Sequence, residues 1–292
     1  MTVAGEEPRR ARTISVIRAV ATTVILATAL VGCAPTPDAP PAAGATSEIT
    51  LPALGAAFDY QLGGAYDPPA GVTVVARDRT TAASGVGYDI CYVNGFQTQP
   101  AESEVFARER PELVLFSNGE PLVDAGWPDE YLFDTSTPQK RAALLEIVAE
   151  WIRGCAASGY DAVEIDNLDS YTRSGGALTA QDNLDLAAAY ARAAHDAGLA
   201  IAQKNTADLT ERVRGVGYDF AVTESCVRFE ECDAYTSVYP VVLDIEYTDE
   251  LGERGFAEAC DDTGRAASMI LRDHDLVASD DDAYVFRTCD AG

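Results

Sequence analysis

The segment KRAALLEIVAEWIRGCAASGYDAVEID, residues 140–166, contains a helix pattern that passes directly into a strand pattern. Apolar residues at spacings of three and four predict one buried stripe on this helix: Leu144, Val148, Trp151, Ile152 and Cys155. Ser136 or Thr137 can cap its start, where Pro138 suits the first turn. Gly159 ends it, and the strand YDAVEID begins immediately afterwards. Such a connection is typical of an α/β protein with a parallel sheet.

Short apolar segments of the strand type recur along the chain, with helical patterns between several of them. The predicted strands cover residues 57–62, 72–77, 88–94, 161–166, 199–204, 218–223, 238–247 and 266–271, with 131–134 as an additional short candidate. A second helix is predicted between Thr179 and Gly198, and His195 would cap its last turn. Eight parallel strands close a barrel, and roughly 245 residues is a usual length for one. We therefore predict a single-domain (β/α)8 TIM-type barrel over residues 51–292; two small domains are the alternative, although no second linker is evident.

The first 50 residues differ from the rest in composition. Four arginines precede the apolar run AVATTVILATALVG, which is typical of a secretory signal peptide and short of the roughly 20 residues that span a membrane. LVGC at 30–33 resembles a bacterial lipobox, in which Cys33 would be lipidated; a plain signal peptide is the alternative. We expect a signal peptide over 1–32 and a Pro- and Ala-rich flexible tether over 33–50. The protein would be exported and lipid-anchored to the outer face of the cell membrane, or secreted.

The chain is strongly acidic, with 47 acidic and 21 basic residues. Residues 1–32 contain two of the acids and four of the bases, so the remainder has 45 acids, 17 bases and a net charge near −28. Nucleic acid is a poor partner for such a surface, whereas a cationic ligand would be attracted to it. Solubility or a saline habitat would also explain the charge, which therefore supports a cationic substrate without establishing one.

Six cysteines remain besides Cys33. An even number on an exported chain predicts disulfides, although fifteen pairings are possible. Proximity in sequence favours Cys226–Cys232 and Cys260–Cys289, which leaves Cys91–Cys155, with buried free thiols as the alternative for that last pair. A zinc site is not expected, because the chain has no CxxC motif and only two histidines.

Polar side chains end several of the predicted strands: Gln61, Asn94, Asp166, Asn167, Lys204, Asn205, Glu224, Asp244 and Glu246. In a (β/α)8 barrel the C-terminal strand ends build the active site, although strand ends can also be polar only because loops begin there. Side chains alternate along a strand, so Glu164 and Asp166 share one face. Asp166 and Glu224 would then face each other across a pocket, with Lys204 between them or, alternatively, in a buried structural ion pair.

Breaking a glycosidic bond requires at least two opposed carboxyl groups. One acts as the acid, and the other acts as the nucleophile or the base. Lys204 could hold one of them ionised. Other catalytic motifs are missing: the sequence has no GxSxG, P-loop, HExxH or dinucleotide-binding fingerprint. DNLDS is a loose fragment of a calcium loop without the remaining ligands. We predict no cofactor and no metal.

Six segments carry a family resemblance: YDICYVNGFQTQP, GWPDEYLFDTST, YDAVEIDNLDSY, GLAIAQKN, DFAVTESCVRFEECDAY and LDIEYTD. In order and spacing they resemble the endo-α-1,4-polygalactosaminidase family, glycoside hydrolase family 114, from about Phe58 to Tyr247. The resemblance implies a (β/α)8-type barrel that cleaves α-1,4-linked galactosamine polymers internally. The family's catalytic Asp would be Asp166 and its catalytic Glu would be Glu224. We assign Asp166 as nucleophile and Glu224 as acid/base in a retaining reaction, with an exchange of the two roles left open.

The first strand departs from the family pattern, because FDYQ at 58–61 stands where many relatives carry Trp-x-Trp-Gln. This leaves the sugar open. The predicted substrate-binding residues are Asp59, Gln61, Tyr92, Asn94, Glu164, Asn167, Lys204, Asn205, Glu246 and Tyr247, while Asp169 would line the rim or cap a helix. We expect a monomer acting on a cationic amino-sugar polysaccharide and touching the membrane only through its lipid anchor. The alternatives are a lipoprotein that binds such a polymer without cutting it, a hydrolase of another glycan, and a structural envelope protein.

Overall fold

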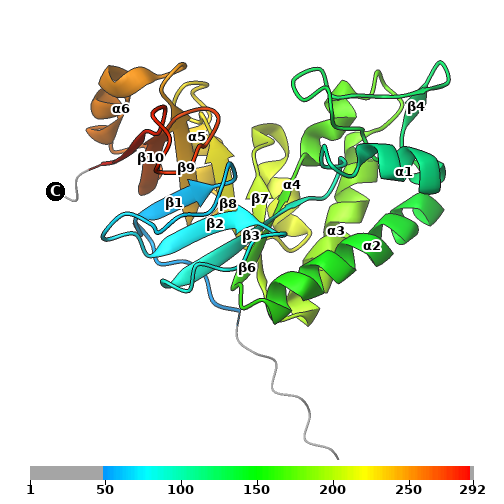
Figure 1. The fold of residues 1–292 in the computed structure, drawn as a ribbon, viewed down its shortest axis with the longest axis horizontal. Coiled ribbons are helices and arrows are strands. Elements are labelled where there is room, and N and C mark those ends of the chain that lie inside the picture. The colour runs from blue at the N-terminus through cyan, green and yellow to red at the C-terminus, as the bar shows by residue number, and fades with distance from the viewer. Residues whose placement is uncertain (1–48, 290–292) are drawn as a thin grey trace, which may run out of the picture. The chain divides into compact units, whose positions relative to one another are not determined.

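The structure, a computed structural model, describes residues 49–289. The predicted signal peptide, Cys33 and nearly all of the tether lie outside the described residues. The main sheet has nine strands in the order β1 (Phe58–Gln61), β2 (Val74–Asp78), β3 (Tyr88–Asn94), β6 (Ala162–Asp166), β7 (Ala200–Lys204), β8 (Phe220–Glu224), β9 (Val242–Tyr247), β10 (Ser268–Arg272) and β11 (Phe286–Thr288). The first eight are parallel and β11 is antiparallel to β10. This curled sheet with helices around it (Figure 1) confirms the predicted α/β fold of the TIM-barrel type.

The helices lie between consecutive strands. They are α1 (Ser103–Glu109), α2 (Pro138–Ala157), α3 (Ala180–Asp196), α4 (Thr210–Gly215), α5 (Cys232–Thr236) and α6 (Gly252–Cys260), with short 3-10 turns at Pro111–Leu113, Leu168–Arg173 and Ala207–Leu209. The two predicted helices are confirmed as α2 and α3, capped by Thr137 and Thr179. The predicted and observed strand boundaries differ most at β9, which begins at Val242, whereas the predicted strand begins at residue 238. Within the predicted strand 131–134, Tyr131, Leu132 and Phe133 form isolated bridges, and a separate small hairpin pairs β4 (Phe116–Ser117) with β5 (Glu120–Pro121).

The two faces of the sheet bury two different cores. Side chains alternate along each strand, so Val163 and Ile165 of β6 pack outward against α2 and α3, which lie side by side (Figure 1). Phe58, Tyr60 and Phe220 fill the interior of the curled sheet. Each such burial of a large apolar side chain stabilises the fold by about 1.5–3 kcal/mol.

The two ends of the parallel sheet are joined by a side chain instead of a strand ladder. Within the described residues, β1 forms its ladder with β2 alone. Arg272 of β10 is fully buried; its Nη1 donates to Asp59 Oδ1 at 3.0 Å and also to the Tyr60 carbonyl oxygen of β1. Removing one partner of a buried ion pair typically costs about 3–5 kcal/mol. Arg272 therefore closes the barrel between its first and last parallel strands.

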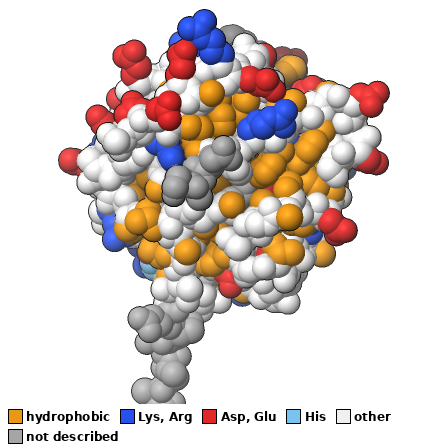
Figure 2. Space-filling view, turned by 90° about the vertical axis from the view of Figure 1, so that its left-hand side faces the viewer, with side chains coloured by type: hydrophobic (Ala, Val, Ile, Leu, Met, Phe, Trp, Pro, Cys, Tyr) orange, Lys and Arg blue, Asp and Glu red, His pale blue; other side chains and the backbone are white. Residues whose placement is uncertain are grey.

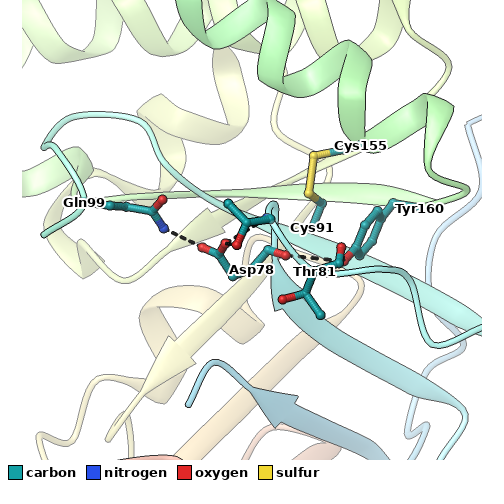
Figure 3. The surroundings of a disulfide bond; sticks show 7 residues. Asp78, Thr81, Cys91, Gln99, Cys155 and Tyr160 are labelled. Carbon is teal, nitrogen blue, oxygen red and sulfur yellow. Dashed lines mark hydrogen bonds between the residues drawn. A yellow bond between two sulfur atoms is a disulfide. The ribbon is translucent and has the colours of Figure 1, made fainter. Parts of the chain in front are cut away.

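Three disulfides fasten the outer elements, and they match the predicted pairing. Cys91–Cys155 joins β3 to the last turn of α2 (Figure 3). Beside it the Tyr160 hydroxyl donates to the Thr81 carbonyl oxygen at 2.9 Å. Cys260–Cys289 joins the end of α6 to the segment after β11, and Cys226–Cys232 closes the loop after β8. A disulfide typically stabilises a fold by about 2–4 kcal/mol.

The described part of the chain has no helix that combines the length and apolar character needed to cross a membrane. On the side that carries β10 and α6, hydrophobic side chains gather over a wide area with acidic side chains around them (Figure 2). A groove of about 370 Å³ runs there between residues 55–58 and 267–270, at the β1–β10 seam.

Candidate active site

A cavity of about 530 Å³ lies at the C-terminal ends of the parallel strands. Six consecutive strands contribute side chains to it at their C-terminal ends: Asp78 from β2, Tyr92 from β3, Asp166 and Asn167 from β6, Lys204 and Asn205 from β7, Glu224 from β8, and Tyr247 from β9. Residues of two long loops complete its wall: Asp124, Trp127 and Glu130 before α2, and His274, Asp275 and Leu276 after β10. The predicted carboxylates are thus brought together around one cavity.

Lys204 is the centre of the site and is 2% exposed. Its Nζ lies 3.1 Å from Glu224 Oε2 and 3.5 Å from Asp166 Oδ2, and it donates to the Tyr60 hydroxyl at 3.0 Å. Burial alone would lower the pKa of Lys204, but the surrounding carboxylates outweigh burial and raise it well above its usual value. One buried cation therefore lies within 3.5 Å of both carboxylates.

Glu224 accepts two hydrogen bonds besides its contact with Lys204. The Tyr247 hydroxyl donates to Oε1, and Asn205 Nδ2 donates to Oε2 at 3.0 Å. Burial raises the pKa of Glu224, but Lys204 and these donors outweigh burial and lower it below the usual value. Asn205 also accepts from the Glu224 backbone N–H at 2.8 Å, so this one amide fixes both ends of the residue.

Asp166 is oriented by neighbours on its own and the adjacent strand. The Tyr92 hydroxyl donates to Oδ2 at 2.7 Å, and the Asn167 backbone N–H donates to Oδ1 at 2.7 Å. Asn167 has a left-handed backbone with φ of 65°, which Asn tolerates better than most residues. This backbone conformation directs the Asn167 N–H toward the Asp166 carboxylate. The Asn167 side chain points to Asn94, where its Nδ2 donates to Asn94 Oδ1 at 3.0 Å.

Glu164 lies one layer below the cavity floor and is fully buried. The Tyr60 hydroxyl donates to Oε1 at 2.6 Å, and Lys204 Nζ is 3.3 Å from the same oxygen. Burial raises the pKa of Glu164 to about 7, because the attraction of Lys204 only partly offsets the loss of solvation. Its Oε2 has no hydrogen-bond partner among the described residues. The side chain supports Lys204 and Tyr60 from below and does not line the cavity.

Two residues of the first strand that were predicted as substrate contacts lie away from the cavity. Phe58 and Tyr60 point into the barrel, so Asp59 and Gln61 point outward. Asp59 is paired with Arg272, while Gln61 donates to Asp59 at 2.8 Å. Neither residue lines the cavity. The acid of FDYQ is therefore part of the barrel closure and not of the cavity wall.

Two other predicted contacts are also displaced from the cavity. Glu246 is fully buried on the outer face of β9, where Oε1 accepts from the Val227 backbone N–H at 2.7 Å. Asn94 is 1% exposed and donates to Glu130 at 2.9 Å. Asn94 thus positions cavity residues without reaching the cavity itself, and Glu246 anchors the loop after β8.

The cavity residues on the long loops before α2 and after β10 were not predicted from the sequence. Glu130 lines it, and burial raises the pKa of this carboxyl. Asp169, expected at the rim, lines the cavity and accepts from Arg173 at 2.8 Å. Arg173 also lies 2.7 Å from Asp124. The only sequence signal for this wall was the family-like segment GWPDEY, which says nothing of the loop's conformation.

Two observations concern other candidate sites. His195 lies in the last turn of α3, 2.8 Å from Asp219, and does not line the cavity. Among residues 49–289, the one group with metal-ligand spacing is Cys226, Cys232 and Asp244, and its two cysteines are joined in a disulfide. Their sulfurs are therefore not available as thiolate ligands.

A TIM-type barrel with two opposed carboxylates at its C-terminal strand ends is the architecture of a glycoside hydrolase. The model of glycoside-hydrolase family GH114 matches residues 38–292, and the chain belongs to this family. This confirms the resemblance seen in the sequence. No curated protein sequence matches the chain.

Solved structures share the fold at low sequence identity. Ega3 from Aspergillus fumigatus, crystallised in complex with galactosamine, is similar with a TM-score of 0.63 and 22% identity, over 82% of this chain and 96% of Ega3. The glycoside hydrolase domain of PelA from Pseudomonas aeruginosa is similar with a TM-score of 0.51 and 15% identity, over 79% of this chain and 97% of that domain.

Proposed function

We propose that this protein cleaves α-1,4-linked galactosamine-containing polysaccharide with Asp166 and Glu224 as its catalytic carboxylates. The observation that carries the proposal is the placement of both carboxylates around Lys204 at the mouth of the barrel. The galactosamine bound in the Ega3 crystal supports an amino sugar as substrate. So does the acidity of the chain, because a formal net charge of −26 attracts a polymer of ammonium groups.

The shared contact with Lys204 limits the distance between the two carboxylates, for which we propose a retaining mechanism. Lys204 Nζ is 3.5 Å from Asp166 and 3.1 Å from Glu224, so these two oxygens are no more than about 6.6 Å apart, the sum of the two distances. Retaining enzymes place the carboxyl groups about 5–5.5 Å apart, and inverting enzymes about 6.5–9.5 Å apart. This upper limit concerns only the two oxygens nearest Lys204; it includes the retaining range and does not by itself separate the two mechanisms.

In the proposed reaction Asp166 attacks the anomeric carbon while Glu224 gives its proton to the departing glycosidic oxygen. Glu224 then removes a proton from water, which displaces Asp166 from the glycosyl ester and restores both groups. The pKa of Glu224 is lowered in the free site, so this role requires that bound substrate exclude water and thereby raise it. In the exchanged assignment, with Glu224 as nucleophile, the lowered pKa belongs to the group that must be ionised.

Azide rescue distinguishes the two assignments. If Asp166 is the nucleophile, Asp166→Gly with azide gives a β-glycosyl azide, because azide attacks the substrate directly from the opposite face. Glu224→Gly with azide gives an α-glycosyl azide, because azide attacks the ester on Asp166. The exchanged roles would reverse these two products.

The substrate proposal is tested with two polymers that differ only in acetylation. We expect the purified protein to release reducing ends from de-N-acetylated α-1,4-galactosamine polymer and to lower its viscosity early, as internal cleavage does. Fully acetylated polymer has no ammonium groups and should react more slowly. Equal rates on both polymers would remove the electrostatic argument, and tight binding without new reducing ends would indicate a binding protein.

We also infer that the protein is exported and anchored through Cys33. The proposal rests on the basic and apolar N-terminal segment and on LVGC at residues 30–33. Growth of the producing cells with a labelled fatty acid should label the wild type and leave Cys33→Ser unlabelled. Equal labelling of both would exclude this cysteine as the attachment site.

A further inference from the structure

A second hollow of about 510 Å³ continues from the catalytic cavity. The two share Trp127, Asp169, Asn205, Glu224, Tyr247 and His274, so they form one open depression around the catalytic carboxylates. The second hollow, here called the Phe229 groove, is further lined by Asp208, Ser225, Phe229, Glu231, Tyr235 and Glu250. A polymer held at the catalytic carboxylates would therefore have room to continue into the Phe229 groove.

The Phe229 side chain is 57% exposed, although it is a large apolar group. It stands on the loop between β8 and α5, beyond the strand end that carries Glu224. Trp127, on the shared border of the two hollows, is 60% exposed. Exposed aromatic groups that line a hollow are typical of ligand-binding surfaces.

The loop that carries Phe229 is rigidly held. The disulfide Cys226–Cys232 spans it, and the Val227 backbone N–H donates to the buried Glu246 at 2.7 Å. Inside the loop the Phe229 backbone N–H donates to the Ser225 carbonyl oxygen at 3.0 Å. A ring on a fixed loop loses little conformational freedom when a ligand packs on it. The fold thus presents this apolar ring in a preformed position.

The charge of the Phe229 groove suits a cation. Carboxyl groups of Asp169, Asp208, Glu224, Glu231 and Glu250 line it, and its described lining has no lysine or arginine. Outside the lining, the Arg228 guanidinium lies 5.8 Å from the Phe229 ring centroid. An amino sugar has both an apolar C–H face for an aromatic ring and an ammonium group for a carboxylate.

We infer that the Phe229 groove binds further amino-sugar residues of the substrate chain, beyond those at the cleaved bond. The ring of Phe229 packs on the C–H face of one sugar, and Glu231 and Asp208 attract its ammonium group. This inference rests on the proposed function and adds to it a dependence on chain length. Phe229 contacts the distant part of the substrate and takes no part in the chemical step.

Chain-length kinetics with Phe229→Ala test the inference. With de-N-acetylated α-1,4-galactosamine octasaccharide, we expect kcat/KM to fall about tenfold, which corresponds to about 1.4 kcal/mol. With the trisaccharide, which is too short to fill both hollows, we expect no change. Leu54→Ala is the matched control, because Leu54 is 71% exposed and lines neither hollow. An unchanged kcat/KM for the octasaccharide, or equal losses for both lengths, would overturn the inference.

A binding measurement separates this inference from the proposed function. Isothermal titration of the octasaccharide into Asp166→Asn and into Asp166→Asn/Phe229→Ala should show about tenfold weaker binding to the second protein. If the wild type cleaves no oligosaccharide and this difference remains, the proposed catalysis fails while the groove assignment stands. Equal affinity of the two variants would overturn the groove assignment, whatever the catalytic result.

Discussion

Replacing Glu164 by glutamine should flatten the pH dependence of stability. Glu164 is fully buried beneath the catalytic cavity, and burial raises its pKa from the ordinary 4.5 to about 7. Between these two values the folded protein binds a proton that the unfolded chain has released. The free energy of unfolding therefore decreases as the pH rises through this window. A glutamine side chain cannot ionise, so that part of the decrease should disappear in the variant.

The size of the effect follows from the two pKa values. A folded-state pKa of about 7 against 4.5 in the unfolded chain lowers the free energy of unfolding by about 2.5 kcal/mol between pH 5 and pH 8. Burial also raises the pKa of Asp244 and of Glu246, so the wild type should lose more than this amount. The difference between wild type and Glu164→Gln isolates the contribution of Glu164.

The assay is urea denaturation with intact disulfides at pH 5, 6, 7 and 8. Glu164→Gln also leaves an amide without a partner near Oε2, which lowers stability at every pH and does not alter the slope. Glu146→Gln on the exposed side of α2 is the matched control and should keep the wild-type slope. Parallel curves for wild type and Glu164→Gln would refute the reasoning that Glu164 is protonated in the folded protein at mildly acidic pH.

Three other substitutions test the barrel closure and the charges of the site. Arg272→Ala leaves buried Asp59 without its partner and should lower the free energy of unfolding by about 3–5 kcal/mol, measured by denaturation; a loss below about 1 kcal/mol would contradict the closure. Lys204→Met should reduce kcat at least about 100-fold with the fold retained by circular dichroism, because it removes the cation between the carboxylates; near-normal turnover would contradict this role. Tyr247→Phe removes a donor to Glu224 and so raises its pKa. If Glu224 is the acid, the alkaline limb of the kcat/KM profile should move to higher pH; movement of the acidic limb alone would favour Glu224 as nucleophile.

The strands and the two long helices could be predicted because their signals are local. The stripe from Leu144 to Cys155 and the cap at Thr137 decide α2 within the segment itself. The four residues of β1 are different, since all of them are buried and their polarity does not show which face is inward. The polar Asp59 and Gln61 were therefore assigned to the cavity, whereas a partner more than 200 residues away, Arg272, holds Asp59 outside it.

The catalytic centre was predictable from strand alternation, but its walls were not. Glu164 and Asp166 share a face of β6, and parallel strands bring Lys204 and Glu224 beside them. On β9 the same alternation places Tyr247 at the cavity and Glu246 behind the strand, and the sequence did not show this register because every residue of the strand is buried. The walls, which include Trp127, Glu130 and Phe229, lie on loops whose positions depend on tertiary contacts, such as the bonds from Asn94 to Glu130 and from Val227 to Glu246.

The central claim is that Asp166 acts chemically on a galactosamine polymer. The most direct test incubates wild type, Asp166→Asn and Asp169→Asn with de-N-acetylated α-1,4-galactosamine polymer and measures released oligosaccharides by mass spectrometry. Asp169 lines the same cavity and is paired with Arg173, so it is the matched carboxylate outside the proposed chemistry. We predict oligosaccharides from wild type and Asp169→Asn, and none from folded Asp166→Asn. Oligosaccharides from Asp166→Asn at the wild-type rate would contradict the account.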